Sequence, residues 1–407
     1  MKLLRVIATL DPKHGRPAAG LRAITPELAR LGHETEFVSL DAPGRAAEFA
    51  SDICVHALGP ARGGYAYGAR LLPWLRANAA DYDAVFVHGL WQYHGRAVHA
   101  ALRKSSTPYF VFPHGMLDPW FRQAYPLKHV KKWLYWQLVE RRVLRDAAAV
   151  FFTCDEERRL ASKSFSPYAC TERVVAYGTA APAVDHGRQP DEWRESVPQL
   201  GDRPFWIFLG RIHPKKGVDV LLKAYGEHAA RFPEPPVLVL AGPCADSAYR
   251  ELLEKIVQRL PDGCRVMWTG MLEGARKWSA LASAEVFVLP SHQENFGIAV
   301  VEALAVGTPV LISRKVNIWE EIESEGAGFT DTDDLAGTVR LLSRWRTLPE
   351  SDRKKMNRTA TELFKNRYEI GRVARSLIQS VTPFLRSSRS KAPHEVIPSN
   401  EPINPLG

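Results

Sequence analysis

Short apolar and β-branched runs alternate along this chain with longer stretches whose apolar residues recur at helical spacing. This pattern is typical of parallel β/α units, in which each buried strand is followed by a helix that covers the sheet. The runs predicted to be strands are Leu3–Leu10, Thr35–Leu40, Ala84–His88, Tyr109–Pro113, Val150–Thr153 and Arg173–Ala176, followed by Phe205–Leu209, Val237–Ala241, Val266–Thr269 and Val286–Pro290. We therefore expect an α/β fold of two doubly wound, Rossmann-like domains that face each other across a ligand-binding cleft.

A proline-rich stretch interrupts this alternation and marks the boundary between the two domains. At 407 residues the chain is long enough for each domain to bury its own core. The predicted organisation is an N-terminal domain at 1–183, a linker at 184–202, a C-terminal domain at 203–365, a helix at 366–386 that packs back on the first domain, and a disordered tail at 387–407.

Composition and charge limit the cellular compartment and the kinds of partner that we expect. No run of about 18 apolar residues occurs, and the start of the chain looks like a strand rather than a secretory signal. Five cysteines without a CxxC pair argue against structural zinc and disulfides and favour the cytoplasm. Residues 1–183 hold 24 Lys and Arg against 16 Asp and Glu, which indicates an anionic substrate or membrane surface. No nucleic-acid-binding motif accompanies this charge, so no nucleic acid partner is expected.

The loop after the first strand of the second domain combines a glycine with two cations. Gly210 ends that strand, and Arg211 and Lys216 follow just before a predicted helix. Glycine lets the backbone approach a ligand, and cations near a helix start favour phosphate. A solvated basic loop is the alternative interpretation of this segment taken alone.

A second motif follows the last predicted strand of this domain. Glu294, Asn295 and Phe296 precede Gly297, which opens a helix, and Glu302 lies inside that helix. At about 1.5 Å per residue, roughly 7–8 Å separate the helix start from Glu302, which is about the span of a pyrophosphate. A capping Glu294 and a solvent-facing Glu302 are the alternative. The apolar neighbours of Glu302 favour a functional role, because a carboxylate is seldom buried without a partner.

These two motifs resemble the signature of glycosyltransferase family 4, and the likeness extends from Leu3 to about Phe364. Members of this family are retaining, nucleotide-sugar-dependent enzymes with the two-domain GT-B fold. The most specific part is the stretch that reads ENFG at 294–297, EALA at 302–305 and GTPV at 307–310.

The resemblance implies a role for each matching residue. Residues placed like Arg211 and Lys216 neutralise the diphosphate, the position of Glu294 contacts the donor sugar, and that of Glu302 holds the ribose hydroxyls. By the same likeness, the residues that line the base pocket are Met271 and Leu272.

The segment PHGMLDP at 113–119 resembles a stretch found in polysaccharide-building members of the family, whose histidine lies by the donor sugar. This likeness assigns His114 to the catalytic site. A histidine that Asp118 holds in a loop is the alternative. Near the amino terminus the family has a glycine pair that approaches the phosphates. Here Gly15 and Gly20 are the expected donor contacts, and Arg16 replaces the second glycine of the pair.

Between Trp120 and Arg145 basic residues interleave with aromatic ones. A helix of this composition can lie in a headgroup layer, whereas the alternative is a core helix with solvated cations. The candidate membrane or acceptor contacts are Lys128, Lys131, Lys132, Trp133 and Trp136. We expect a cytoplasmic protein that is peripheral on the inner face of the cytoplasmic membrane if this helix contacts lipid.

No metal or other cofactor is expected, apart from the nucleotide sugar as co-substrate. Asp81-Tyr82-Asp83 matches the Asp-x-Asp pattern of manganese-binding glycosyltransferases, but it precedes a strand, whereas ligand-facing residues normally follow strands. The second match, Asp331-Thr332-Asp333, is better explained as a helix cap.

The leading functional hypothesis is transfer of a hexosyl unit, with retention, from a UDP- or GDP-sugar. The acceptor would be a glycan or a polyprenyl-diphosphate-linked oligosaccharide in exopolysaccharide, capsule or O-antigen assembly. Two alternatives remain open, a nucleotide-sugar 2-epimerase of the same fold and a non-catalytic membrane-surface subunit. Epimerases lack the spacing of Glu294 and Glu302, and intact Arg211 and Lys216 argue against loss of activity.

Overall fold

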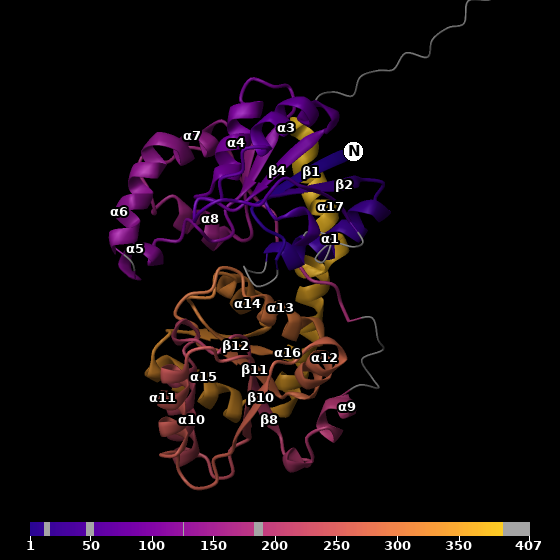
Figure 1. The fold of residues 1–407 in the computed structure, drawn as a ribbon. Coiled ribbons are helices and arrows are strands. Elements are labelled where there is room, and N and C mark those ends of the chain that lie inside the picture. Colours follow the sequence, from indigo (N-terminus) through magenta and orange to yellow (C-terminus); the bar gives the residue numbers. More distant parts are fainter. Residues whose placement is uncertain (12–16, 46–52, 125, 183–189, 386–407) are drawn as a thin grey trace, which may run out of the picture.

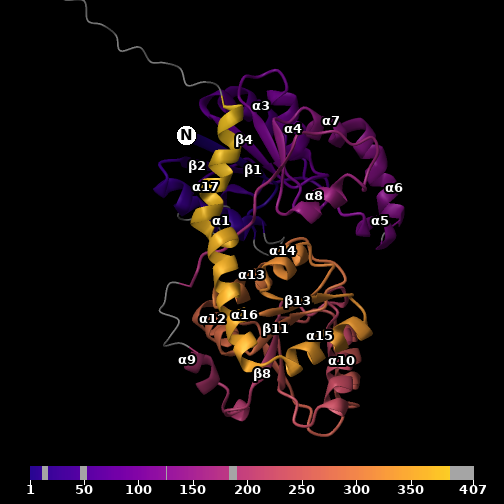
Figure 2. The same ribbon diagram turned by 180° about the vertical axis from the view of Figure 1, so that it is seen from behind.

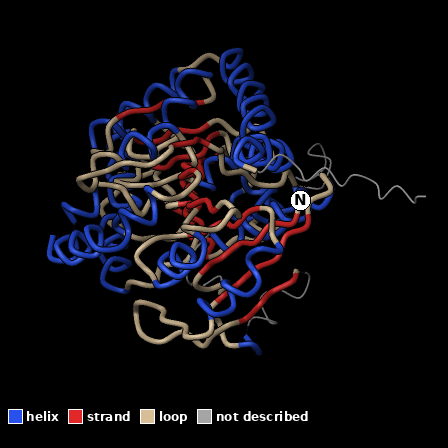
Figure 3. Tube along the Cα trace, turned by 90° about the horizontal axis from the view of Figure 1, so that it is seen from above, coloured by secondary structure: helices blue, strands red, loops and turns tan. Residues whose placement is uncertain are grey.

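The computed structural model describes residues 1–11, 17–45, 53–124, 126–182 and 190–385. They form two α/β domains, each built on a parallel sheet with helices on both faces (Figure 1). Seen from above, the strands lie in the middle and the helices surround them (Figure 3). The expected fold class, two Rossmann-like doubly wound domains, is confirmed.

The first sheet has seven strands in the order β3-β2-β1-β4-β5-β6-β7. These are β1 (Lys2–Ile7), β2 (Glu34–Ser39), β3 (Cys54–Ala57), β4 (Ala84–His88), β5 (Tyr109–Phe112), β6 (Ala149–Phe152) and β7 (Glu172–Val174). Its helices are α1 (Pro17–Arg30), α3 (Leu71–Asn78), α4 (Tyr93–Leu102), α5 (Trp120–Ala124), α6 (Pro126–Tyr135), α7 (Arg141–Arg145) and α8 (Asp155–Ala161), with a π-helical turn at Trp136–Glu140 between α6 and α7.

The second sheet has six strands in the order β10-β9-β8-β11-β12-β13. These are β8 (Phe205–Leu209), β9 (Val237–Ala241), β10 (Val266–Gly270), β11 (Val286–Leu289), β12 (Val310–Ser313) and β13 (Gly328–Asp331). Its helices are α9 (Pro190–Glu195), α10 (Val218–Arg231), α11 (Ser247–Val257), α12 (Gly274–Ser283), α13 (Ile298–Ala305), α14 (Trp319–Glu325), α15 (Leu335–Thr347) and α16 (Glu350–Leu363), and α17 (Ile370–Val381) follows them.

The order of strands reverses at one point in each sheet. The reversal falls between β1 and β4 in the first domain and between β8 and β11 in the second. Ligands of doubly wound sheets bind beyond the carboxyl ends of the strands at such points. The loops that follow β8 and β11 carry both motifs of the second domain, so the topology places them together.

Helix α17 crosses from the second domain to the first. Figures 1 and 2 show it running along one side of the first sheet beside α1. Its apolar residues Ile370, Val373 and Leu377 are buried in one cluster with Leu3 and Phe86 of the sheet. Helix α17 therefore completes the core of the first domain.

The structure differs from the prediction at the linker and at three strands. Residues 190–200 are not linker, because Trp193 of α9 is buried at 1% exposure against Phe205 in the second core. Strands β3, β12 and β13 were not predicted, since each has only four residues. Ser313 in β12 and Gly328 and Asp331 in β13 also weaken a strand pattern. Residues 183–189 and the predicted tail 387–407 lie outside the described residues. No described helix is long and apolar enough to span a membrane.

Candidate active site

The loops after β8 and β11 are packed directly on each other. Lys216 ends a short 3-10 turn, and Gly217 follows with a left-handed backbone, at φ +65°. A side chain at Gly217 would overlap the carbonyl oxygen of Pro290, which begins the other loop. Glycine is therefore required here by both backbone conformation and close approach.

This packing brings Lys216 and Glu294 into an ion pair between their side chains. Both side chains are mostly buried, at 13% and 17% exposure. The backbone of Glu294 is held by the β12–α14 turn, because its N–H donates to the Lys315 carbonyl at 2.9 Å and its carbonyl accepts from the Asn317 N–H at 3.0 Å. These two backbone hydrogen bonds therefore fix the position from which the Glu294 carboxylate extends.

Glu294 also lies over the start of α13. Its Cγ would be 3.4 Å from a Cβ added to Gly297, whose φ of +75° again favours glycine. The ion pair with Lys216 and the first N–H groups of this helix therefore share one small region. A cation beside a helix N-terminus is an arrangement that binds anionic oxygens.

Glu302 lies in α13 among buried apolar residues, as its neighbours in the sequence indicated. Its carboxylate forms an ion pair with Lys277 of α12 at 2.7 Å, and its side chain is 12% exposed. The sequence carried no signal for Lys277, because the partner comes from a different helix with no motif around it.

His114 of the first domain lies in a turn that reaches the second domain. His114 and Gly115 both have positive φ, at +50° and +77°, which tightens the turn after β5. A Cβ on Gly115 would lie 2.6 Å from Cγ of Asn295, so this turn touches the motif that follows Glu294. Two predicted parts of the site, one from each domain, are thus in contact.

A buried carboxylate that the sequence analysis missed holds this turn. Glu157 of α8 accepts from the Gly115 N–H at 2.6 Å and from the N–H and hydroxyl of Thr153 at 2.7 and 2.6 Å. Burial raises the pKa of Glu157, while these bonds act in the opposite direction. Thr153 also accepts from the Asn295 side-chain amide at 3.4 Å, which links the support to the second domain.

Further contacts join the two domains near the same point. The Gln293 amide donates to Asp118 at 2.6 Å. Tyr177 lies between His114 and Phe296, with ring centroids 6.3 and 5.6 Å away. Asp118 is therefore engaged with the second domain and does not hold His114, so that alternative interpretation of the histidine is wrong.

The remaining predicted donor residues are placed more loosely. Arg211 is exposed and forms no hydrogen bond or ion pair within the described part of the chain. Met271 is 63% exposed after β10, and Leu272 packs against the second core. Gly210 ends β8 with φ +156°. Gly20 lies in α1 where a side chain would overlap the Tyr177 hydroxyl, and Gly15 and Arg16 lie outside the described residues.

The basic aromatic segment forms α5 and α6, which project from the first domain on the side away from α17 (Figure 1). Lys132 and Trp136 are on its inward face, which corrects their prediction as surface contacts. Trp136 is 1% exposed, and the Lys132 ammonium lies over the rings of Trp91 and Phe121 at 4.8 and 5.3 Å. Burial lowers the pKa of Lys132.

The outward face of this helix is apolar. Lys128, Lys131 and Trp133, the other predicted membrane or acceptor contacts on this helix, are exposed. Beside them lies an apolar stripe that was not predicted, formed by Leu127, Val130 and Leu134 of α6 and Leu138 of the π-helical turn that continues it, at 54–86% exposure. Their spacing of three and four residues places them on one side of the helix.

The first Asp-x-Asp match lies away from this site, and the second borders the loop after β11 that carries Glu294. Asp83 accepts from the Lys2 N–H before β4, as expected for a segment ahead of the strand. Asp331 pairs with Arg340 and Asp333 with His292. The cap of α15 is Asp334, one residue beyond the predicted match.

Chains similar to this one are glycosyltransferases. Residues 189–362 match the profile of glycosyl transferases group 1, and residues 17–178 match a glycosyl transferase 4-like domain. A GDP-mannose-dependent alpha-(1-6)-phosphatidylinositol monomannoside mannosyltransferase of Mycolicibacterium smegmatis is 31% identical over 49% of this chain and 50% of its own length. D-inositol 3-phosphate glycosyltransferase 2 of Catenulispora acidiphila is 36% identical over 35% of this chain and 38% of its own. The chain thus spans about half or less of these relatives.

Solved structures agree in fold. The Anabaena protein HepE in complex with UDP and glucose superposes with a TM-score of 0.70 at 16% identity, over 94% of this chain and all of its own. The sucrose-phosphate synthase of Thermosynechococcus elongatus gives 0.69 at 18% identity, over 94% of this chain and 98% of its own. Each of the two domains thus matches a glycosyltransferase family model, and the chain has the GT-B fold.

Proposed function

We propose that this chain is a retaining glycosyltransferase that moves a hexosyl unit from a UDP- or GDP-sugar to a glycan or a polyprenyl-diphosphate-linked oligosaccharide. Assembly of an exopolysaccharide, capsule or O-antigen is the process this activity would serve. The observation that carries the proposal is the Lys216–Glu294 pair at the start of α13, in contact through Asn295 with the His114 turn. The names of the relatives support a nucleotide-sugar donor, because one is GDP-mannose-dependent and one solved structure contains UDP and glucose.

The proposed chemistry is stabilisation of the leaving diphosphate. Lys216, Arg211 and the N–H groups at the start of α13 oppose the negative charge that grows on the diphosphate as the glycosidic bond breaks. Glu294 accepts from hydroxyls of the donor sugar, and Glu302 accepts from the ribose. Retention follows if the acceptor attacks the face from which the diphosphate leaves, so that the diphosphate takes the acceptor proton.

Binding of the donor is the first test. Thermal unfolding of the full chain with UDP, GDP, ADP and their sugars should show stabilisation by one base class. A ligand at 100 times its Kd adds about 2.7 kcal/mol to the free energy of unfolding. We expect this stabilisation and the turnover with acceptor to persist in EDTA, because protein cations supply the positive charge. No stabilisation by any nucleotide, or activity lost in EDTA and restored by manganese, would contradict the proposal.

We also propose that the stripe on α6 contacts an anionic membrane surface, where a lipid-linked acceptor would be found. Its four apolar side chains are flanked by Lys128 and Lys131, a combination that suits burial in the headgroup layer with cations toward anionic lipid. The full chain should float with vesicles of equal parts phosphatidylglycerol and phosphatidylcholine, and less so at high salt.

Paired acidic substitutions test this contact. Leu134→Glu with Leu138→Glu should abolish flotation, because both side chains are exposed and would carry charge into the headgroup layer. Leu252→Glu is the matched control, since this leucine is 47% exposed on α11 of the other domain. Equal flotation of the double variant and the control would refute the contact.

A further inference from the structure

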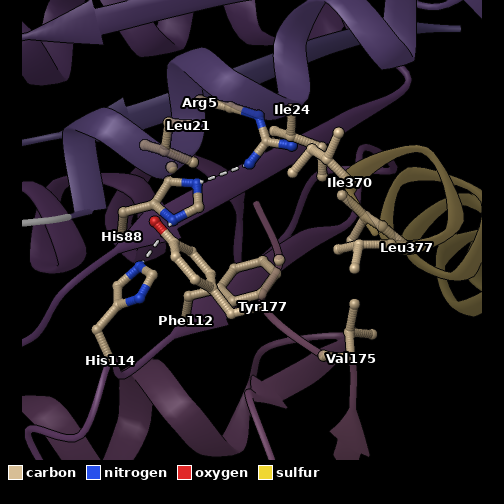
Figure 4. A pocket seen from close by; sticks show the side chains of 14 residues that line it. Arg5, Leu21, Ile24, His88, Phe112, His114, Val175, Tyr177, Ile370 and Leu377 are labelled. Atoms are coloured by element: carbon tan, nitrogen blue, oxygen red, sulfur yellow. Dashed lines mark hydrogen bonds between the residues drawn. The ribbon is translucent and has the colours of Figure 1, made fainter. Parts of the chain in front are cut away.

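Three side chains form a hydrogen-bonded chain from the interior of the first domain to the His114 turn, which contacts the second domain. Arg5, in the middle of β1, is 1% exposed, and its Nη1 lies 3.2 Å from Nε2 of His88 at the end of β4. Nδ1 of His88 lies 3.1 Å from Nε2 of His114. Figure 4 shows the three side chains in sequence beside Tyr177, lining a small pocket.

The direction of each bond in this chain follows from the first donor. A guanidinium has only N–H donors and no acceptor, so Nε2 of His88 must accept. A neutral His88 then carries its proton on Nδ1 and donates it to Nε2 of His114. His114 in turn accepts at Nε2, and its own proton must be on Nδ1. One buried arginine thus decides the tautomer of two histidines.

The surroundings keep both rings neutral. Burial and the nearby charge of Arg5 hold the pKa of His88 well below its usual range and lower that of His114 to about 4. Among the residues that the structure describes, no carboxylate forms an ion pair with Arg5, His88 or His114. Nδ1 of His114 has no hydrogen-bond partner in this part of the chain either, which leaves its N–H for a ligand.

A role in packing alone does not account for Arg5. Its Nε and Nη2 are buried without hydrogen-bond partners among the described residues. A buried guanidinium with unsatisfied donors costs stability, and an aliphatic side chain would fill the same space without that cost. The Arg5 guanidinium lies 5.2 Å from the Phe86 ring, and its hydrogen bond within the described residues goes to His88, which orders the histidines.

We propose that Arg5 and His88 are positioning residues that lock His114 in the Nδ1–H tautomer, so that it presents a hydrogen-bond donor to an oxygen of the donor sugar. This inference rests on the proposed function for the identity of the ligand, whereas the tautomer itself does not. An Nε2–H tautomer would offer an acceptor at the same place, and a sugar oxygen could not then be held as hydrogen-bond acceptor.

The tautomer is measured directly by NMR. In protein labelled with ring-¹⁵N histidine, long-range ¹H–¹⁵N spectra distinguish a protonated Nδ1 from a protonated Nε2, and His114→Gln identifies the signals of His114. We expect Nδ1–H for His114 in the unliganded wild type at neutral pH. Nε2–H in that spectrum would overturn the proposal without any variant of Arg5.

Variants of Arg5 test the cause. Arg5→Met should shift His88 and His114 to a mixture of tautomers, and Arg5→Lys, which is also a pure donor, should keep Nδ1–H. An unchanged His114 spectrum in a folded Arg5→Met protein would refute the role of Arg5.

Turnover assays separate this proposal from the function on which it draws. With an active donor and acceptor, Arg5→Met should lower kcat about 10- to 100-fold, the range for residues that orient another group, and Arg5→Lys should restore most of it. In a His114→Gln background Arg5→Met should add little further loss, because both act on one hydrogen bond. If His114 is protonated at Nδ1 but the protein binds no nucleotide sugar, the proposed function is refuted and the tautomer assignment stands. If Arg5→Met and His114→Gln lower kcat independently, so that their losses multiply, the positioning role of Arg5 is refuted and the proposed function is not.

Discussion

Lys216→Ala should lower kcat about 100- to 1000-fold, with a smaller effect on KM, because its ammonium stabilises charge that grows on the diphosphate in the transition state. The substitution also leaves the mostly buried Glu294 carboxylate without this cation, beside the place where the diphosphate would lie. Steady-state kinetics with the donor identified by thermal unfolding measures both constants. Arg211→Ala should have a weaker effect, since Arg211 is exposed.

Lys354→Ala is the control for this experiment. Lys354 is exposed on α16, where it pairs with Glu350 at 2.6 Å, and its loss should leave kcat and KM unchanged. A variant of Lys216 that changes KM alone would indicate uniform binding of substrate and transition state, which contradicts the proposed role.

Gly217→Ala should disrupt both stability and activity. A left-handed backbone costs alanine about 1–2 kcal/mol, and the overlap with the Pro290 carbonyl adds a comparable cost, so we expect about 2–4 kcal/mol of destabilisation. Relief of the overlap must separate the loops that hold Lys216 and Glu294. A displacement of about 1 Å can lower activity about 100-fold, which we expect in kcat/KM. Urea unfolding and turnover measure the two effects.

Gly326→Ala isolates the backbone contribution. Gly326 has φ +72° at the end of α14, and nothing lies within 4 Å of an added Cβ. This variant should lose only the 1–2 kcal/mol of the left-handed conformation and keep its activity. If both variants lose the same stability and activity, close packing on Pro290 does not hold the site.

The site was predictable where one local segment carries both the structure and the chemistry. Gly297 begins a helix, Glu294 precedes it and Glu302 follows within it, so spacing alone related these residues. Lys277, Glu157 and Gln293 were not predictable, because each meets its partner through tertiary packing between different helices or domains.

One missed residue did leave a signal. Arg5 interrupts the apolar run of the first strand, and a charge in the middle of a buried strand is unusual. The sequence could not show which side chain it meets, because His88 lies on another strand. For α6 the composition indicated a candidate surface helix, but it did not show which side chains face inward and which face outward. The prediction rested on the cations and aromatic residues, whereas the exposed stripe consists of leucine and valine, which usually indicate a core.

The path of α17 has a consequence for synthesis of this protein on the ribosome. Its residues Ile370–Val381 cover an apolar face of the first sheet, yet they are translated after the entire second domain. The domain made first thus acquires its last layer only after the second domain has been made. Until then Leu3, Ile24 and Phe86 lack their final cover, and a nascent chain halted before Ile370 presents that face to chaperones.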